Sequence, residues 1–336
     1  MKKLFNILLA VIMIMACAFS LTACAPDDGG SDGKTGLIVS RDKKGNYVVR
    51  DFVYVDGCLS EDGTLDIGEV LAERNIASAK ISAGAFDGDD KIKTLIVSDK
   101  IVEIEQGAFR NMKSLETLEV PFVGKNAKTD AIFDQTNQAV GKSVRKEATF
   151  SHFFGTAEYD EGSKMNNGYG DVYVPLTLKN VIVNATANVD YTALDKEGYA
   201  IGQYAFKDAR LLQNITLKGE NLKEIGEEAF SGCTSIQSIT LPSTIKTVYQ
   251  SAFNGCTALT EVVFEGTNVV LKNNVFSGCT KVNKLNSQTE LTVDLLCFSA
   301  IGENALDFGR SVEYKVRNRG EFNLEKIFGE TSHIVV

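Results

Sequence analysis

A short hydrophobic pattern recurs along this chain and constrains its fold more than any other feature. The clearest copy is residues 225–242, IGEEAFSGCTSIQSITLP, in which Phe230 follows an alanine and has aliphatic residues five positions before it and six and nine positions after it. Contiguous copies lie 22 to 24 residues apart. The phenylalanines that align are Phe86, Phe109, Phe206, Phe230, Phe253, Phe276 and, in a degenerate last copy, Phe298. A repeat of this length predicts a solenoid of stacked coils.

Each copy also contains an alternation of apolar and polar residues that is typical of a β-strand. In the clearest copy, Ile239 and Leu241 would point inward and Thr240 outward, because successive side chains of a strand face opposite sides. Such strands would stack from coil to coil into a parallel sheet. One coil cannot bury enough apolar surface to offset the conformational entropy that it loses, so the coils must share a core. We therefore expect a mainly β fold with short helical or irregular segments.

The repeat resembles that of the BspA-like leucine-rich repeat proteins of bacterial surfaces. Their repeats read close to I-G-x-x-A-F-x-x-C-x-x-L-x-x-I-x-L-P, and residues 225–242 match this pattern at nearly every position. The resemblance covers roughly residues 65–298. It implies a right-handed leucine-rich-repeat solenoid with a parallel sheet on one face. It also implies adhesion, or attachment to macromolecules of a host or a neighbouring cell.

The amino terminus has the pattern of a lipoprotein export signal. Lys2 and Lys3 precede a nearly continuous apolar run, and small residues lead to Cys24. We interpret residues 1–23 as a signal peptide, Cys24 as the lipidated residue and residues 24–35 as a flexible tether. An ordinary signal peptide or a single membrane anchor is the alternative. Lipidation would place the protein outside the cytoplasm, on the cell surface, attached to a membrane. Ala25 is compatible with either a Gram-positive membrane or an outer membrane.

The rest of the chain divides around the repeat. Residues 36–64 are expected to form an amino-terminal cap, residues 65–298 the solenoid, and residues 299–336 a carboxyl-terminal cap. An insertion at about residues 122–175 separates the copies at Phe109 and Phe206. A long loop on a rigid scaffold is a place where binding concentrates. Alternatively, the insertion packs on its own Phe153 and Phe154.

No pattern of catalytic residues emerges, and we expect neither an enzyme nor a cofactor. The two histidines, His152 and His333, are not near a nucleophile motif, and no metal-ligand spacing is present. Three cysteines occupy one column of the repeat, which elsewhere holds Met112 and Ala209, so we expect buried free thiols there. They are Cys233, Cys256 and Cys279. A net charge of −9 argues against nucleic acid as a partner.

The remaining candidate is the outer face of the predicted sheet. It lacks a row of aromatic residues, which weakens a glycan-binding interpretation, and its mixture of polar and aliphatic side chains suits a protein partner. The hypotheses left open are recognition of a host or bacterial surface protein, capture of glycans or nutrients, and, remotely, hydrolysis. The residues predicted to form the binding face are Thr94, Ile96, Thr117, Glu119, Ile182, Asn214, Thr216, Ser238, Thr240, Glu261, Val263, Lys284 and Asn286.

Overall fold

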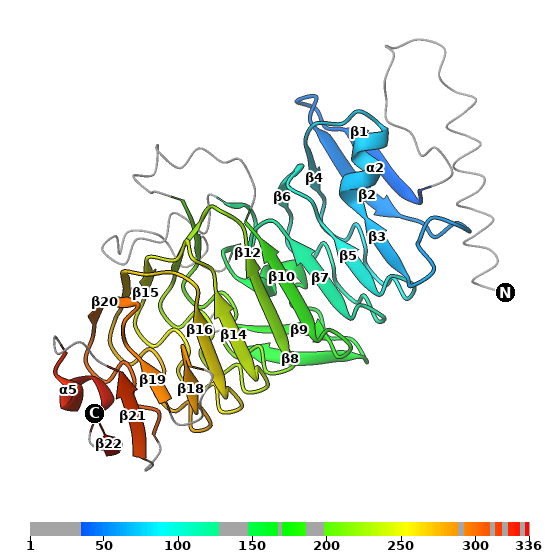
Figure 1. The fold of residues 1–336 in the computed structure, drawn as a ribbon. Helices are drawn as coiled ribbons and strands as arrows, with labels where there is room; N and C mark the ends of the chain where they lie inside the picture. Colours follow the sequence, from blue (N-terminus) through cyan, green and yellow to red (C-terminus); the bar gives the residue numbers. More distant parts are fainter. Residues whose placement is uncertain are drawn as a thin grey trace, which may run out of the picture.

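The computed structural model shows an elongated solenoid in which successive coils stack along one axis (Figure 1). It describes residues 35–127, 147–166, 170–185, 198–287, 292–309, 313–317, 322–329 and 333–335. The expected signal peptide, Cys24 and nearly all of the tether lie outside the described residues. No helix in the described ranges is both long enough and apolar enough to cross a membrane.

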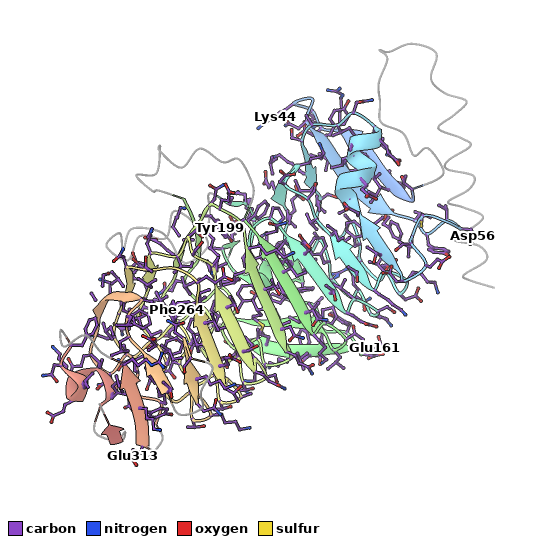
Figure 2. All side chains as sticks on the ribbon, in the orientation of Figure 1. Lys44, Asp56, Glu161, Tyr199, Phe264 and Glu313 are labelled. Atoms are coloured by element: carbon purple, nitrogen blue, oxygen red, sulfur yellow. The ribbon has the colours of Figure 1, made fainter. Side chains whose placement is uncertain are left out.

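A β-hairpin begins the solenoid. Strands β1 (Leu37–Arg41) and β2 (Tyr47–Phe52) pair antiparallel, and Gly45 adopts φ of 82° in the turn that joins them. Strand β2 then pairs parallel with the next coil. Figure 2 shows Lys44 in this turn at one end of the molecule and Glu313 at the opposite end. The hairpin thus covers the first open face of the core, as a cap must.

The predicted parallel sheet runs along one side of the solenoid, and we call it the first sheet. It forms two hydrogen-bonded groups, with β12 lying beside β14 where they meet (Figure 1). Inward residues such as Ile239 are buried and outward ones such as Thr240 are exposed, as the alternation predicts. Its strands are β3 (Thr64–Asp66), β5 (Thr94–Ile96), β7 (Thr117–Val120), β10 (Asn180–Asn184), β12 (Asn214–Lys218), β14 (Ser238–Leu241), β16 (Glu261–Phe264), β18 (Lys284–Leu285), β19 (Thr292–Asp294), β21 (Glu313–Arg317) and β22 (His333–Val335).

A second parallel sheet, which the sequence did not reveal, is built from the aliphatic column five residues before each anchor. Its strands are β4 (Ala79–Ile81), β6 (Ile101–Ile104), β11 (Tyr199–Ile201), β13 (Leu222–Ile225), β15 (Thr247–Val248), β17 (Val269–Leu271) and β20 (Phe298–Ile301). Among the described residues, β4 and β6 continue from β2, and β11 to β20 form a separate sheet. The second sheet is therefore divided between β6 and β11, where the first sheet is continuous through β7, β10 and β12.

The anchor phenylalanines form a ladder of rings inside the solenoid. From Phe206 through Phe230 and Phe253 to Phe276 the centroids are 5.0–5.3 Å apart and the rings are nearly parallel. All of these rings are at most 1% exposed. Aromatic pairs of this kind contribute about 0.5–1.5 kcal/mol each beyond the area that they bury. The ladder is consequently a main contact between coils.

The turn that leads into each anchor requires a left-handed backbone. The residue two positions before the anchor has φ between 50° and 73° in every described copy. Only the first two copies use glycine there, although an L-residue in this conformation is strained. These residues are Gly84, Gly107, Tyr204, Glu228, Ser251, Asn274 and Asn304, of which Asn304 precedes Leu306, the anchor of the last copy as shown below.

The predicted insertion proves to be one enlarged coil that shares the common core. A 3-10 helix, η1 (Phe150–Phe153), places Phe153 against Phe109, with centroids 5.5 Å apart, and Phe150 against Phe206, at 5.1 Å. The rings of Phe153 and Phe154 do pack on each other, with centroids 6.3 Å apart, as the alternative interpretation of the insertion requires, but Phe153 also belongs to the common core. What projects from this coil is an antiparallel hairpin, β8 (Gly162–Asn166) and β9 (Asp171–Pro175).

The degenerate last copy was anchored on the wrong residue. Phe298 lies on β20, paired with Val269 of the second sheet. In a regular coil the anchor N–H donates to the carbonyl just before the next anchor, and Phe276 donates to Ala305 O at 3.0 Å. The seventh anchor is therefore Leu306, so the predicted boundary at residue 298 falls within a coil. The sequence pattern does not reveal this anchor because a leucine replaces the phenylalanine and this copy is longer.

In the part of the chain that the structure describes, two short α-helices complete the fold. Helix α2 (Ile67–Glu73) follows β3, and its N-cap residue Asp66 accepts hydrogen bonds from the N–H groups of Gly68 and Glu69. Helix α5 (Leu324–Phe328) lies at the carboxyl-terminal end. There the rings of Phe308, Tyr314 and Phe328 pack on one another and extend the ladder beyond Phe276. They close the second open face of the core.

Candidate functional site

The outer face of the first sheet carries an ordered row of uncharged polar side chains. Strand pairing places Thr64, Thr94, Thr117, Asn180 and Asn214 in register on five neighbouring strands. Ser238 begins the next strand, β14, and is exposed. We call these six residues the polar row. Its members contribute hydroxyl and amide groups, which donate and accept hydrogen bonds without a net charge.

Internal hydrogen bonds orient the centre of the polar row. The Asn214 amide donates to Asn180 Oδ1 at 2.8 Å, and the Asn180 amide donates to Thr117 Oγ1 at 3.2 Å. The chain of bonds fixes which way each amide points. A partner would therefore meet groups that are already ordered, which lowers the entropic cost of binding.

Glu119, a charged residue in the middle of this face, already has polar partners within the protein. Glu119 accepts a hydrogen bond from the Asn184 amide at 2.9 Å, and Lys218 Nζ lies 4.0 Å from its other carboxylate oxygen. On either side of Glu119, Ile96 and Ile182 lie in register with it and are partly exposed. The face from β5 to β14 thus combines neutral polar groups with aliphatic ones.

Every predicted binding-face residue lies on this side of the first sheet or directly after one of its strands, and none is buried. Asn286 differs from the others in its contacts. Its Oδ1 accepts the Phe264 N–H at 2.6 Å, and its amide lies 2.7 Å from Cys297 Sγ. Both polar groups of the Asn286 side chain are therefore bonded to other parts of the solenoid. Near it, Glu261 and Lys284 are paired in register and bring charge to the face beyond β14.

Two members of the polar row were missed from the sequence, Thr64 and Asn180. Asn180 lies in the enlarged coil, where the regular spacing of the repeat is interrupted between Phe109 and Phe206. Aligning Val181 with Ile215 would have placed Asn180 in the column of Asn214, as the register shows.

No group of three or more potential metal ligands occurs among the described residues. His152 is 5% exposed and its Nε2 lies 2.9 Å from Ile104 O, so it is a packed ring as expected. For His333 only the backbone is described.

The three repeat cysteines form a buried column of free thiols, as predicted. Each Sγ donates to the carbonyl of the anchor phenylalanine one coil earlier, at 3.0–3.2 Å. Burial raises the pKa of Cys233 and Cys279. A protonated, enclosed thiol is a poor nucleophile, so this thiol column is structural. Its members are Cys233, Cys256 and Cys279.

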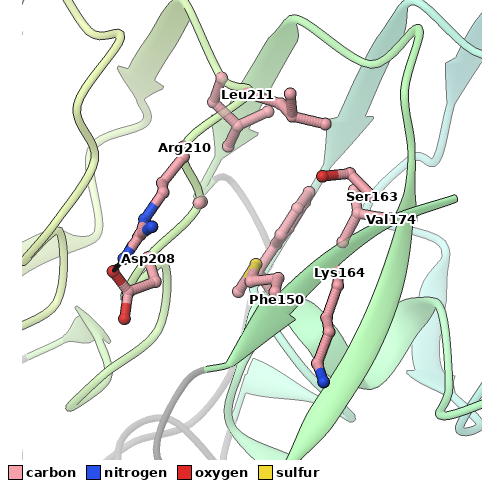
Figure 3. Close-up of a pocket in the computed structure, with 10 residues that line it drawn as sticks. Phe150, Ser163, Lys164, Val174, Asp208, Arg210 and Leu211 are labelled. Atoms are coloured by element: carbon pink, nitrogen blue, oxygen red, sulfur yellow. Dashed lines mark hydrogen bonds and ion pairs between the residues drawn. The ribbon is translucent and has the colours of Figure 1, made fainter.

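A small cavity opens beside the projecting hairpin (Figure 3). It separates β8 and β9 from residues 208–212, which lead into β12. Phe150 forms its floor, and Lys164 and Arg210 lie on opposite sides of it (Figure 3).

Comparison with known proteins identifies the repeat. The pattern described as "BspA type Leucine rich repeat region" matches residues 76–139 and 184–313 in six copies, which is more than half of the chain. No curated protein is similar enough to match.

Among solved structures, three bacterial proteins are similar to this chain. The T. pallidum leucine rich repeat protein TpLRR is 13% identical, with a TM-score of 0.30, over 74% of this chain and 88% of that one. A leucine-rich repeat protein from Eubacterium ventriosum is 10% identical, with a TM-score of 0.31, over 87% and 96%. A leucine rich cell surface protein from Faecalibacterium prausnitzii is 12% identical, with a TM-score of 0.25, over 94% and 96%. At such identities and scores, the family assignment rests on the repeat pattern. By that pattern, the chain belongs to the family of proteins with the BspA type leucine rich repeat region.

Proposed function

We propose that this protein is a non-catalytic recognition protein of the cell surface, anchored through lipid on Cys24, that binds a protein partner with the outer face of its first sheet. The polar row carries the proposal, because it presents ordered, uncharged hydrogen-bonding groups across six strands. The Ile96 and Ile182 side chains beside it add apolar contact. Protein interfaces combine an apolar centre with hydrogen-bonding groups in this way.

Repeat proteins commonly bind along an extended face, since the coils supply a rigid surface whose residues recur at a fixed spacing. Adhesion to a host or neighbouring cell is the role that we infer for such a face on an exported chain. The lipoprotein pattern of residues 1–24 supports export and anchoring.

Site-specific cross-linking tests the binding face. A photoreactive amino acid replaces Asn214 in the polar row or, as a matched control, exposed Ala300 on the outer side of the second sheet. Cells carrying each full-length variant are mixed with candidate host or bacterial cells and irradiated. We expect a discrete polypeptide adduct from position 214 and none from position 300. Equal adducts from both positions, or binding of glycans with no polypeptide adduct, would overturn the proposal.

A substitution series then tests the chemistry of the face. Asn180→Lys combined with Asn214→Lys places two like charges on adjacent strands of the polar row. The control is Val102→Lys, since Val102 is 49% exposed on the second sheet. Loss of the adduct in the first variant alone supports recognition by the polar row. Retention of the adduct in both variants contradicts it.

The anchor has its own test. Cys24→Ala is expected to abolish the incorporation of labelled fatty acid, whereas Cys17→Ala, a change at the other cysteine of the amino-terminal apolar segment, is expected to leave it unchanged. If both variants stay with the membrane and neither wild type nor variant incorporates labelled fatty acid, the anchor is not a lipid.

A further inference from the structure

The cavity beside the hairpin has an apolar interior and a charged rim. Its interior is formed by Phe150, Met165, Val174 and Leu212, each at most 5% exposed, together with Ala209. The rim is formed by Ser163, Lys164, Asp208 and Arg210 (Figure 3). An apolar hollow with a few polar groups at its mouth is the usual form of a binding pocket.

Residues at both ends of the hairpin fasten it to the preceding coil. Toward the preceding coil, Lys113 and Glu161 form an ion pair at 2.8 Å. Thr177 Oγ1 donates to the carbonyls of Lys113 and Leu115 at 3.1 and 2.8 Å. Toward the following coil, the hairpin leaves the space above Phe150 open. Two rigid elements thus define its walls.

The size of the space fits one aliphatic side chain. Its volume is about 60 Å³. On the same measure, one water requires about 10–15 Å³, so the cavity has room for roughly four to six water-sized groups. A leucine side chain has four carbon atoms. Because the interior is apolar, a hydrocarbon group is favoured there over water.

The rim supplies two cations. The Lys164 and Arg210 side chains are 59% and 69% exposed. Lys164 Nζ pairs with Asp171 at 2.6 Å, and Arg210 pairs with Asp208 at 3.0 Å. Ion pairs at such exposed positions are weak, so a bound anion can share or replace these carboxylates. Together with Asp171 and Asp208 these two cations leave the rim electrically neutral, so in a chain of net charge −9 an anion meets less repulsion here than at the acidic surface elsewhere.

We propose that this cavity binds the carboxyl-terminal residue of a polypeptide, with an aliphatic side chain on Phe150 and Met165 and the terminal carboxylate between Lys164 and Arg210. Such a residue carries its hydrocarbon group and its anion on the same carbon atom, which matches the adjacent interior and rim. Capture of a terminal carboxylate is a known mode of peptide recognition. The inference goes beyond the proposed sheet-face function and does not depend on it.

Three short peptides test the proposal with the purified protein. Acetyl-Gly-Gly-Leu, its carboxamide and acetyl-Gly-Gly-Ala are each titrated while the ¹³C-labelled methyl group of Met165 is followed by NMR. Met165→Leu assigns the signal. We expect the leucine acid to shift this signal saturably. The carboxamide should bind at least five-fold more weakly because it lacks the anion, and the alanine peptide at least five-fold more weakly because it leaves the cavity unfilled.

Two variants and a control complete the test. Ala209→Leu would fill the cavity, and Arg210→Gln would remove one rim charge without touching the interior. Arg317→Gln is the matched control, because Arg317 is 70% exposed and also faces a carboxylate, that of Asp294. We expect at least five-fold weaker binding of the leucine acid to both pocket variants and unchanged binding to the control.

The proposal is overturned if no peptide moves the Met165 signal or if acid and carboxamide bind equally. It is also overturned if Arg210→Gln and Arg317→Gln behave alike. Should Ala209→Leu fail to fold, the Arg210→Gln comparison decides the question alone. The Asn180→Lys and Asn214→Lys substitutions should leave this binding unchanged, so the pocket and the sheet face can fail independently.

Discussion

Exchanging residues between two equivalent turns tests the claim that the repeat imposes a left-handed backbone before each anchor. Ser251 and Gly107 occupy the same position in different coils, with φ of 56° and 73°. The left-handed conformation costs an L-residue about 1–2 kcal/mol. Glycine loses about 0.5–1 kcal/mol more conformational freedom on folding than alanine does. The difference leaves a net effect of about 0.5–1 kcal/mol. Ser251→Gly should therefore stabilise the protein, and Gly107→Ser should destabilise it by a similar amount.

The surroundings of Gly107 and Ser251 add no steric clash and no lost hydrogen bond to the effect of the backbone conformation. A Cβ atom at Gly107 would find only Gly155 Cα within 4 Å, at 3.9 Å, so serine meets no steric obstacle there. The Ser251 side chain makes no hydrogen bond within the part of the chain that the structure describes. The control is Ser277→Gly, one residue after an anchor, where φ is not positive. Glycine there should destabilise by about 0.5–1 kcal/mol.

Thermal unfolding followed by circular dichroism measures the outcome. A change of 1 kcal/mol shifts Tm by about 2–4 °C in proteins of 150–250 residues, so shifts of about 1–3 °C are expected for this longer chain. Ser251→Gly should raise Tm, while Gly107→Ser and Ser277→Gly should lower it. If Ser251→Gly lowers Tm as much as Ser277→Gly does, the backbone conformation is not the controlling factor and the reasoning fails.

Three further predictions concern the core. Phe150→Ala should cost about 3–5 kcal/mol, measured by urea unfolding, because Phe150 joins the enlarged coil to Phe206, and a loss below about 1 kcal/mol would contradict this. The thiol column should resist labelling at pH 8 until the protein unfolds. Burial raises the folded-state pKa of Cys233 and Cys279. Their contribution to stability is therefore complete below the unfolded thiol pKa of about 8.5 and is lost as pH rises toward the folded value, so stability should fall above pH 9, less so in Cys233→Ala. Asn286→Ala should cost about 1–2 kcal/mol and speed labelling of Cys297, whose pKa burial raises to about 12.

The sequence predicted those features that repeat in register. Period-two alternation assigned Ile239 inward and Thr240 outward, because strand geometry fixes the two faces whatever the surroundings. The same logic predicted the buried thiol column, since a slot that also accepts Met112 must be apolar. Fold and outer face follow from local rules of this kind.

Departures from the repeat could not be predicted in this way. Leu306 serves as an anchor although it is not a phenylalanine, and its position is set by the bond between Phe276 and Ala305 rather than by spacing. Phe150 and Phe153 enter the ladder from a 3-10 helix that has no counterpart in the other coils. The hairpin cavity arises where segments some 40 residues apart approach each other, and no local pattern records such an approach.

The division of the second sheet has a mechanical consequence. Among the described residues, strand pairing in the second sheet stops between β6 and β11. There the coils are joined by the first sheet, by the aromatic rings and by single backbone hydrogen bonds, such as that from Phe150 N–H to Ala205 O at 2.8 Å. When a load acts along the axis, as between a tethered amino end and a captured partner, fewer bonds resist it on that side of the solenoid. Under tension we expect the chain to part there or between β12 and β14, where strand pairing is interrupted in the first sheet, into an amino-terminal and a carboxyl-terminal block.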